Sequence, residues 1–340
     1  MIDLKDSFRK PKIMKISVTD LQDLSRKAIL KYGYTAEEAS QILNILMYAQ
    51  LRGNNQGIVK LVGRGIPKNP NAGEIKIIKE TKLSALLDGA NNMGMIVVNR
   101  AMGIALEKAK EHGFAIVGTN NTSSSTGAIG YYAREIAQEN FLGFVFAGSP
   151  ETVTTHGSYE PLFGTNPLAI GIPTENKPIV FDMATAAMAY YGLIQAKTAG
   201  ESIPGDVAYD SEGSLTTDPA KAMDGAILPF DRNYKGAGLA MMVEIFTGPL
   251  VGATFVGIGK GDWGNLVYII DPELLVSLAD FKKQVTQMIK KVKSAGKLPG
   301  VTDIFYPGER GDKQTSRVIE AGEIEVEDNL YNKLKSFVEE

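Results

Sequence analysis

Hydroxyl groups and a histidine gather in one part of this sequence, residues 115–173, directly after two short apolar segments. The first apolar segment, 115–117, leads into the hydroxyl cluster Ser123–Thr126. The second, 142–147, leads into a polar loop that carries His156. Short apolar runs of this kind indicate buried strands. Because open α/β sheets bind ligands in the loops that follow their strands, the two junctions predict a ligand pocket.

Charged residues elsewhere suit an anionic ligand. Lys60 and Arg64 are four residues apart in a segment expected to be helical. Two cations on one helical face repel by roughly 0.2–0.5 kcal/mol unless an anion such as a carboxylate or phosphate lies between them. Two solvated surface cations are the alternative. A predicted strand ends on Asp182 ahead of small residues, which suits a bound nucleotide, and Lys235 precedes a glycine-rich helix start, which suits an anion.

Composition excludes several classes of protein. Basic and acidic residues number 36 and 39, for a formal net charge of -3, so no nucleic-acid partner is expected. Cysteine is absent, and the two histidines, His112 and His156, are far apart, so no metal site is predicted. Neither Gly-x-Ser-x-Gly nor a Gly-x-Gly-x-x-Gly between strand and helix occurs, which argues against a serine hydrolase and an ordinary Rossmann domain. No apolar run is long enough to span a membrane, and a cytoplasmic protein is expected.

Helix caps and apolar spacing predict the elements that position these residues. Ser17 caps one helix, and Thr35 with Glu38 forms a capping box at the start of the next. Gly113 ends a long helix that places His112 at its carboxyl end, where a structural role suffices. Helices are expected at 18–32, 36–51, 95–112, 237–251, 272–295 and 330–340, with further helices around Lys60 and after Gly130 and Asp182. Strands are expected at 14–18, 75–78, 84–88, 115–117, 142–147, 178–182 and 266–270.

Seven motifs carry a resemblance that runs from about Met14 to about Phe337. The chain resembles members of the malate/L-lactate dehydrogenase family of NAD(P)-dependent oxidoreductases, which also includes ureidoglycolate dehydrogenase, sulfolactate dehydrogenase and Δ1-piperideine-2-carboxylate reductase. The motifs occur in the family's order: AQLRG (49–53), STGAIGYYA (125–133), FGTNPLAIGIP (163–173), FDMAT (181–185), TTDP (216–219), the LP…KGAGLAMMVEI stretch (228–245) and YPGE (306–309).

The resemblance implies an α/β fold that is not Rossmann but is similar to L-sulfolactate dehydrogenase. It implies a discontinuous substrate and dimerisation domain (14–120 plus 272–340), a central NAD(P)-binding domain (121–271) and an extension at 1–13. It also implies a homodimer that uses NAD or NADP to transfer a hydride to or from a small 2-hydroxy or 2-oxo acid, or an imine. The implied cofactor-binding residues are Thr165, Asn166, Asp182, Ala184, Thr185, Ala186, Lys235, Gly308 and Glu309.

The chain departs from the family pattern where the family carries two histidines. It reads Asn55-Gln56-Gly57 followed by Lys60 where the family reads Ser-His-Gly followed by arginine, and it has Ser125 before the Gly-x-x-Gly helix entry. We therefore expect His156 to replace the missing acid/base, although a hydrogen-bonded loop residue is as consistent with its position. The expected catalytic residues are His156, Ser125 and Lys60; the expected substrate-binding residues are Gln56, Arg64, Ser149 and Ser124.

Two alternatives to a working dehydrogenase stay open at this level. One is a protein that keeps the fold and a cofactor or ligand but acts as a binding or regulatory module. The other is an enzyme of another class that uses the same pocket. Turnover that depends on the cofactor separates the dehydrogenase from the binding module.

Overall fold

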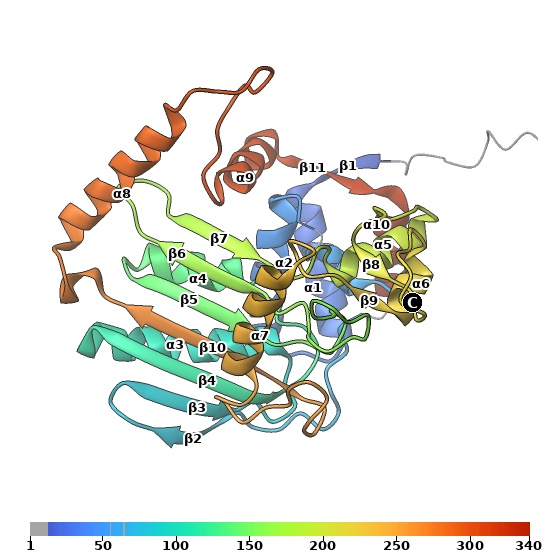
Figure 1. Ribbon diagram of the computed structural model, residues 1–340, viewed down its shortest axis with the longest axis horizontal. Helices are drawn as coiled ribbons and strands as arrows, with labels where there is room; N and C mark the ends of the chain where they lie inside the picture. The colour runs from blue at the N-terminus through green and yellow to red at the C-terminus, as the bar shows by residue number, and fades with distance from the viewer. Residues whose placement is uncertain (1–12, 55, 64) are drawn as a thin grey trace, which may run out of the picture.

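The computed structural model describes residues 13–54, 56–63 and 65–340 (Figure 1). The extension expected at 1–13 lies outside the described residues, apart from Ile13, which begins the first strand, β1 (Ile13–Ser17). Asn55 and the predicted substrate-binding Arg64 also lie outside them.

A seven-stranded mixed sheet forms the centre of the molecule, in the order β2-β3-β4-β10-β5-β6-β7 (Figure 1). Strand β3 is parallel to β4, and β10 is antiparallel to both of its neighbours. The pairings of β6 with β5 and β7 are antiparallel as well, so β3, β4, β5 and β7 all point the same way. The strands are β2 (Lys76–Glu80), β3 (Ser84–Asp88), β4 (Phe114–Thr122), β5 (Leu142–Ala147), β6 (Leu168–Ile172), β7 (Ile179–Met183) and β10 (Trp263–Ile270). The sheet confirms the α/β fold class.

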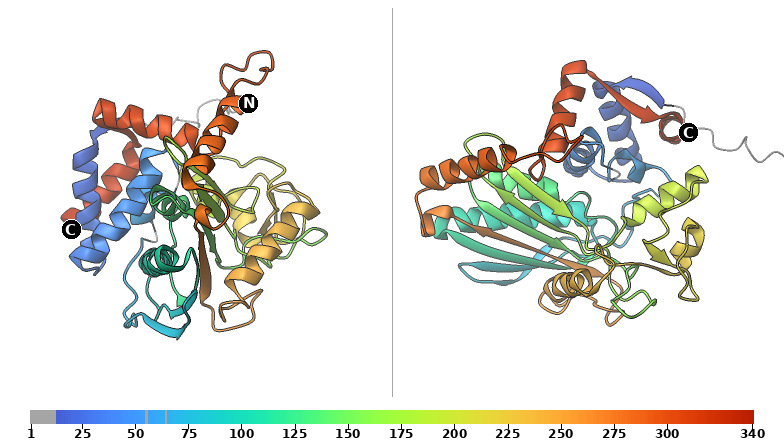
Figure 2. Two further views of the ribbon diagram at one scale, coloured as in Figure 1. Left: turned by 90° about the vertical axis from the view of Figure 1, so that its left-hand side faces the viewer. Right: turned by 45° about the horizontal axis from the view of Figure 1, so that its top comes forward.

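The two faces of the sheet pack in separate cores because side chains alternate along each strand. Val145 and Ala147 of β5 face the larger core with α3 (Gly94–His112) and α4 (Gly130–Gln138). Phe144 and Phe146 face the other core, which contains Val243 of α7 (Tyr234–Thr247). The sheet is therefore covered on both faces (Figure 2).

The two ends of the described chain form one helical unit beside the sheet. Strand β1 pairs antiparallel with β11 (Glu323–Glu327), so residues about 300 apart in sequence share a ladder. Around it lie α1 (Val18–Lys31), α2 (Ala36–Leu51), α9 (Glu309–Ala321) and α10 (Asp328–Glu339). The cap at Ser17 and the capping box of Thr35 with Glu38 are confirmed. Helix α8 (Leu278–Lys293) links the sheet to this unit through the loop that precedes α9 (Figure 1).

The smaller elements lie between β7 and α7, apart from two 3-10 turns. They are α5 (Tyr190–Ala199), β8 (Ala208–Tyr209), α6 (Pro219–Asp224), β9 (Ala226–Ile227) and the turns η1 (Ile58–Leu61) and η2 (Pro272–Leu274).

The predicted domain boundary between residues 120 and 121 falls inside β4. Strand β10 pairs with β4 on one side, with Val267 opposite Val117, and with β5 on the other, with Val267 opposite Val145. Strands β2, β3 and β4 therefore belong to the same sheet as the strands of the predicted cofactor domain. The sequence gives no sign of this, because backbone pairing between distant strands depends on no single residue type.

Two expected helices also differ from the structure. The segment of Lys60 is the four-residue 3-10 turn η1, and Val62 after it is already extended. Gly63, with a left-handed φ of 71°, follows at once and ends any regular helix. The helix expected directly after Asp182 begins only at Tyr190. In the first segment the N–H groups of Lys60 and Val62 form only short-range turn bonds, and in the second the N–H of Thr185 bonds the carbonyl of Thr165 in another segment.

We predict that Gly171→Ala destabilises the protein, because a Cβ at this position of β6 would overlap the carbonyl of Ala133 in α4. Overpacking of this kind costs about 1–3 kcal/mol. Urea unfolding followed by circular dichroism measures the loss. Gly103→Ala is the matched control, since Gly103 lies in α3 with open space around its Cβ position. The free energy of unfolding of the control should rise by about 0.8–1.0 kcal/mol, because alanine favours a helix more than glycine does. An equal loss of stability in both variants would contradict the packing argument.

Candidate active site

Three polar loops meet at one edge of the sheet because β4, β5 and β7 end there. The register shows this directly: Thr122 of β4 lies opposite Trp263 at the start of β10, and Ala147 of β5 lies opposite Asn265. Met183 at the end of β7 lies opposite Leu168, at the start of β6. The segments that follow these strands hold Ser123–Thr126, Ser149 and Thr185, so the structure brings these predicted site residues to one side of the sheet.

The hydroxyl loop is held by a buried polar network that the sequence did not reveal. Thr126 is buried, and its hydroxyl lies 3.3 Å from Oδ1 of Asn265. The Nδ2 group of Asn265 donates to Oγ1 of Thr119 at 3.0 Å. Ser125 accepts a hydrogen bond from the N–H of Gly127 at 3.1 Å, so its hydroxyl helps to form the turn. Ser124 is exposed and has a left-handed φ of 56°. A lone asparagine in an apolar strand was the only sign of this network.

The GTNP and FDMAT motifs are bonded to each other and to the segment before Lys235. Oγ of Ser149 accepts from the N–H of Thr165 at 2.9 Å, and the carbonyl of Thr165 accepts from the N–H of Thr185 at 2.9 Å. The carbonyl of Thr185 accepts in turn from the N–H of Phe230 at 2.8 Å. These bonds hold motifs that are far apart in sequence next to one another. Lys235 is exposed in the first turn of α7.

Other implied cofactor residues use their polar groups or backbone inside the protein. Asn166 is fully buried, and its Nδ2 donates to Glu244 at 2.6 Å and to the carbonyl of Ala240 at 3.2 Å, which joins the GTNP turn to α7. Ala186 forms a β-bridge with Pro229. Ala184, two residues after Asp182, is half-buried. The bonds of Asn166 to α7 therefore hold the GTNP turn in place.

A cleft of ≈ 830 Å³ opens between the end of α2, the end of β7 and the start of α9. Tyr48 and Arg52 line it from α2, Asp182 from β7, and Gly308 from the turn before α9. The Arg52 guanidinium pairs with Asp312 at 2.6 Å, donates to the Gly308 carbonyl at 3.0 Å and lies over the Tyr48 ring. Tyr48 and Arg52 were not predicted as site residues, although Arg52 belongs to the AQLRG motif.

Asp182 is the acid of this cleft. Water reaches it from the open side, but protein groups surround the carboxylate elsewhere, and this desolvation raises the pKa of Asp182 to about 6. The N–H of Gly130 at the start of α4 donates to Oδ2 at 2.8 Å, and this bond and the charge of Arg52 oppose the shift. A Cβ on Gly130 would lie 2.7 Å from the same oxygen, so only glycine allows this approach.

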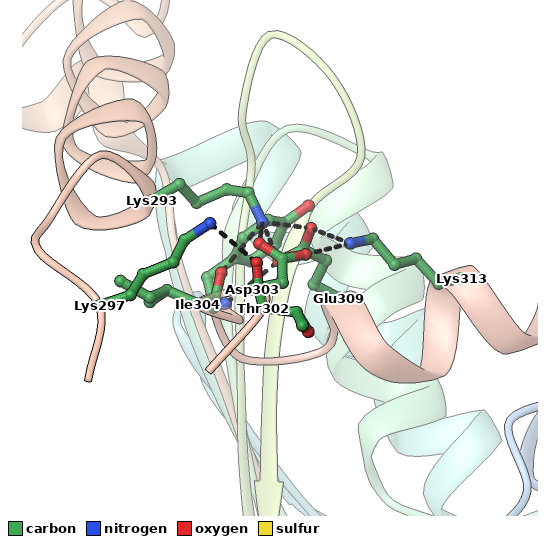
Figure 3. Close-up of polar contacts among 8 residues, drawn as sticks. Lys293, Lys297, Thr302, Asp303, Ile304, Glu309 and Lys313 are labelled. Atoms are coloured by element: carbon green, nitrogen blue, oxygen red, sulfur yellow. Dashed lines mark hydrogen bonds and ion pairs between the residues drawn. The ribbon is translucent and has the colours of Figure 1, made fainter. Parts of the chain in front are cut away.

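Glu309 is buried and anchors the loop between α8 and α9 (Figure 3). Its carboxylate pairs with Lys293 at 2.7 Å and with Lys313 at 3.2 Å. Burial opposes ionisation, but the hydrogen bonds from these two lysines outweigh it and lower the pKa of Glu309. The resemblance implied cofactor binding by this residue, whereas its oxygens are used to hold the turn at Gly308.

Lys60 and His156 lie in opposite environments. Lys60 is only 2% exposed, with Nζ 3.6 Å from the centre of the Tyr191 ring in α5. Burial lowers the pKa of Lys60 to about 7. His156 is exposed, and its ring lies edge-on to that of Tyr234, with 6.4 Å between centroids. Gln56 is half-buried in the turn before η1. The structure therefore buries Lys60 and leaves the His156 ring open to water.

No metal-binding group of three or more acids and histidines occurs among the residues that the structure describes. Within the same residues, no helix combines the length and the apolar character needed to cross a membrane.

Comparison with known proteins agrees with the fold and the motifs. The family model for malate/L-lactate dehydrogenase matches residues 16–335. The chain is 34% identical to malate/(S)-sulfolactate dehydrogenase of Methanothermus fervidus, over 96% of this chain and 98% of the relative. It is 31% identical to ureidoglycolate dehydrogenase (NAD(+)) of Escherichia coli, over 95% of each chain. The crystal structure of malate dehydrogenase from Entamoeba histolytica superposes with a TM-score of 0.89 at 27% identity, over 96% of this chain and 97% of the other.

The chain belongs to the malate/L-lactate dehydrogenase family. It is an oxidoreductase, as its dehydrogenase and reductase relatives are named. The predicted family membership and the predicted similarity to the sulfolactate dehydrogenase fold are both confirmed.

We predict that Asp182→Asn stabilises the protein near neutral pH. The folded protein keeps the Asp182 proton up to about pH 6, whereas the unfolded chain releases it near the ordinary value of 3.8. Stability due to this group therefore falls as pH rises through that window. The asparagine variant escapes the loss and still accepts from Gly130. In thermal unfolding, the variant should have a higher midpoint temperature than the wild type at about pH 7 and the same midpoint temperature at about pH 3.

Asp303→Asn is the control with the opposite sign. Hydrogen bonds from Lys313 and Lys293 lower the pKa of Asp303 to about 2, so its ionised form is favoured by folding. That contribution is present above 3.8 and is lost as pH falls toward 2. The Asp303 variant should be less stable than the wild type near neutral pH. Destabilisation by Asp182→Asn at neutral pH would refute the desolvation argument.

Proposed function

We propose that this protein transfers a hydride between a nicotinamide cofactor, NAD or NADP, and a small 2-hydroxy or 2-oxo acid. The observation that carries the proposal is the cleft lined by Asp182, whose carboxylate accepts from the N–H of Gly130, and by Gly308. Relatives named for malate, sulfolactate and ureidoglycolate support a small hydroxy-acid substrate. The NAD(+) in the name of the ureidoglycolate enzyme supports a nicotinamide cofactor.

The residues of the cleft fit a dinucleotide. A volume of ≈ 830 Å³ lies within the range of small-molecule sites, about 300–1,000 Å³. Asp182 offers oxygens to sugar hydroxyls, in the role that an acid after a strand has in other nucleotide sites. Gly308 adopts a left-handed φ of 88°, and a Cβ there would lie 3.0 Å from the Val180 carbonyl on the cleft wall. The bound cofactor supplies the carbon that accepts or donates the hydride.

Lys60 is the residue we propose for proton transfer to and from the substrate oxygen. A buried amine with a pKa of about 7 exchanges its proton at neutral pH, which an ordinary lysine does not. In its charged form it also attracts the carboxylate of the acid. Its Nζ lies 3.6 Å from the centre of the Tyr191 ring in α5, and Lys60 follows the cleft-lining residues 52–54 in sequence. Ser125 and Ser149 are the proposed hydroxyl partners of the substrate.

The outer face of α7 supports the proposal of a homodimer. Apolar residues there follow helical spacing, so they form a single exposed stripe. Exposed apolar surfaces of this kind mark interaction sites, and a two-fold dimer buries the same stripe from both chains. The stripe consists of Tyr234, Met241, Met242, Ile245 and Phe246, with Leu250 beyond the helix end.

We expect Lys60→Met to lower kcat/KM for reduction of a 2-oxo acid by about 100- to 10,000-fold, the contribution of a positioned general acid. Lys60→Arg keeps the positive charge, but an arginine does not release its proton near pH 7. This variant should therefore keep the KM of the wild type, lose kcat, and lose the inflection near pH 7 in the pH profile of kcat. Steady-state kinetics from NADH or NADPH absorbance, with pyruvate, oxaloacetate and sulfopyruvate as substrates, provide the test. Turnover of any of these acids by the wild-type protein also supports the proposed reaction.

His156→Ala is the matched comparison. Because His156 is exposed, its removal should cost less than the roughly 100-fold that marks a general acid or base. A dead His156 variant beside an active Lys60→Met would transfer the role to His156. A wild type that binds cofactor but turns over no acid would overturn the proposed function.

Met242→Glu should dissociate the proposed dimer, because the change places a charge in the centre of the apolar stripe on α7. Sedimentation velocity should give a dimer for the wild type and a monomer for the variant. Ile319→Glu, at an exposed apolar residue of α9, is the control and should leave the mass unchanged. A monomeric wild type would reject the dimer.

A further inference from the structure

A second pocket, of ≈ 290 Å³, adjoins the cleft and is basic. The two share Arg52, Gly53, Phe305 and Arg310 in their walls, so they form one continuous hollow. The remaining wall comes from α9, where residues at positions i, i+3, i+4 and i+7 lie on one face. These are Arg310, Lys313, Gln314 and Arg317.

Some of the basic side chains in this pocket form ion pairs and others do not. Arg52 is paired with Asp312, and Lys313 is paired with Asp303 at 2.6 Å. Arg310 and Arg317 are both exposed, and neither has a carboxylate partner within the described part of the chain. Two guanidinium groups on one helical face therefore point at the same hollow without an anion between them.

The wall that carries these groups is held in place. Glu309 joins Lys293 of α8 to Lys313 of α9, and Asp303 bonds the same two lysines from the intervening loop (Figure 3). This network fixes the loop that carries Phe305, over whose ring the Arg310 guanidinium lies at 5.3 Å. The pocket is therefore a preformed part of the cleft wall, with its two unpaired arginines presented from a braced helix.

We propose that this pocket binds the 2′-phosphate of the adenosine ribose, so that the protein prefers NADP(H) to NAD(H). The inference rests on the proposed function, because it takes the cleft to be the cofactor site. In nucleotide sites an acid beside the ribose 2′ position favours NAD(H), and an arginine there favours NADP(H). Asp182 lines the main cleft, whereas the adjoining pocket is lined by Arg310 and Arg317 and by no acid among the described residues. Guanidinium groups bind a phosphate by paired, charge-assisted hydrogen bonds.

The test is a set of dissociation constants, measured by calorimetry on the full chain without substrate. The wild type should bind NADPH about tenfold or more tightly than NADH, the scale of one charge-assisted contact. The double variant Arg310→Ala with Arg317→Ala should lose that difference by weakening NADPH alone. The double variant Arg26→Ala with Arg100→Ala removes the same charge from α1 and α3, and it should behave as the wild type.

Nucleotide fragments and free anion separate the remaining outcomes. The probe 2′,5′-ADP should bind about tenfold or more tightly than 5′-AMP, and only the pocket variant should abolish the difference. Equal affinity for NADPH and NADH overturns this inference and leaves the proposed function intact. Inorganic phosphate that binds as tightly as 2′,5′-ADP indicates a general anion site and also overturns it. Failure to bind either dinucleotide overturns both proposals.

Discussion

The pairing of β10 with both β4 and β5 is the interaction on which the rest of the structure depends. A strand from residues 263–270 lies between strands from 114–122 and 142–147 and runs opposite to both. That insertion makes β4 and β5 parallel, with α4 in the connection that crosses from one to the other, and brings their carboxyl ends to the same end of the sheet. Asn265, at the start of β10, then ties the hydroxyl loop to the sheet through Thr126. The polar loops are neighbours because one strand holds both of the strands from which they emerge.

Charged groups around the cleft divide into those that hold the structure and those left for a ligand. Glu309 and Asp303 are neutralised by lysines, and the pKa of each is lowered. Asp182 and Lys60 show the reverse, since desolvation opposes the charged form of each and moves its pKa toward neutrality. The same division separates Arg52, which is paired with Asp312, from the arginines of the adjoining pocket.

Most elements of the fold were predictable from local chemistry. The caps at Ser17 and Thr35, the left-handed Gly113 after α3 and the strand at 142–147 all match the structure, because each depends on residues a few positions apart. The failures occurred where backbone N–H groups bond partners outside a regular helix. The N–H of Ile58 bonds the side chain of Gln50, and the N–H of Thr185 bonds the carbonyl of Thr165. Neither segment forms the helix that its composition favours.

The sequence by itself determined the family, the class of reaction and the strands whose ends carry polar residues, because motifs and periodicity are local properties. Only the tertiary structure decided which of the predicted site residues are available to a ligand. The Nδ2 group of Asn166 donates to Glu244, and the carboxylate of Glu309 pairs with Lys293 and Lys313, while the side chain of Asp182 lines a cleft. Lys60 and His156 look equally polar in sequence, yet one is buried against Tyr191 and the other is exposed beside Tyr234. Burial shifts a pKa through the medium around the group, and that medium consists of residues brought together only by folding.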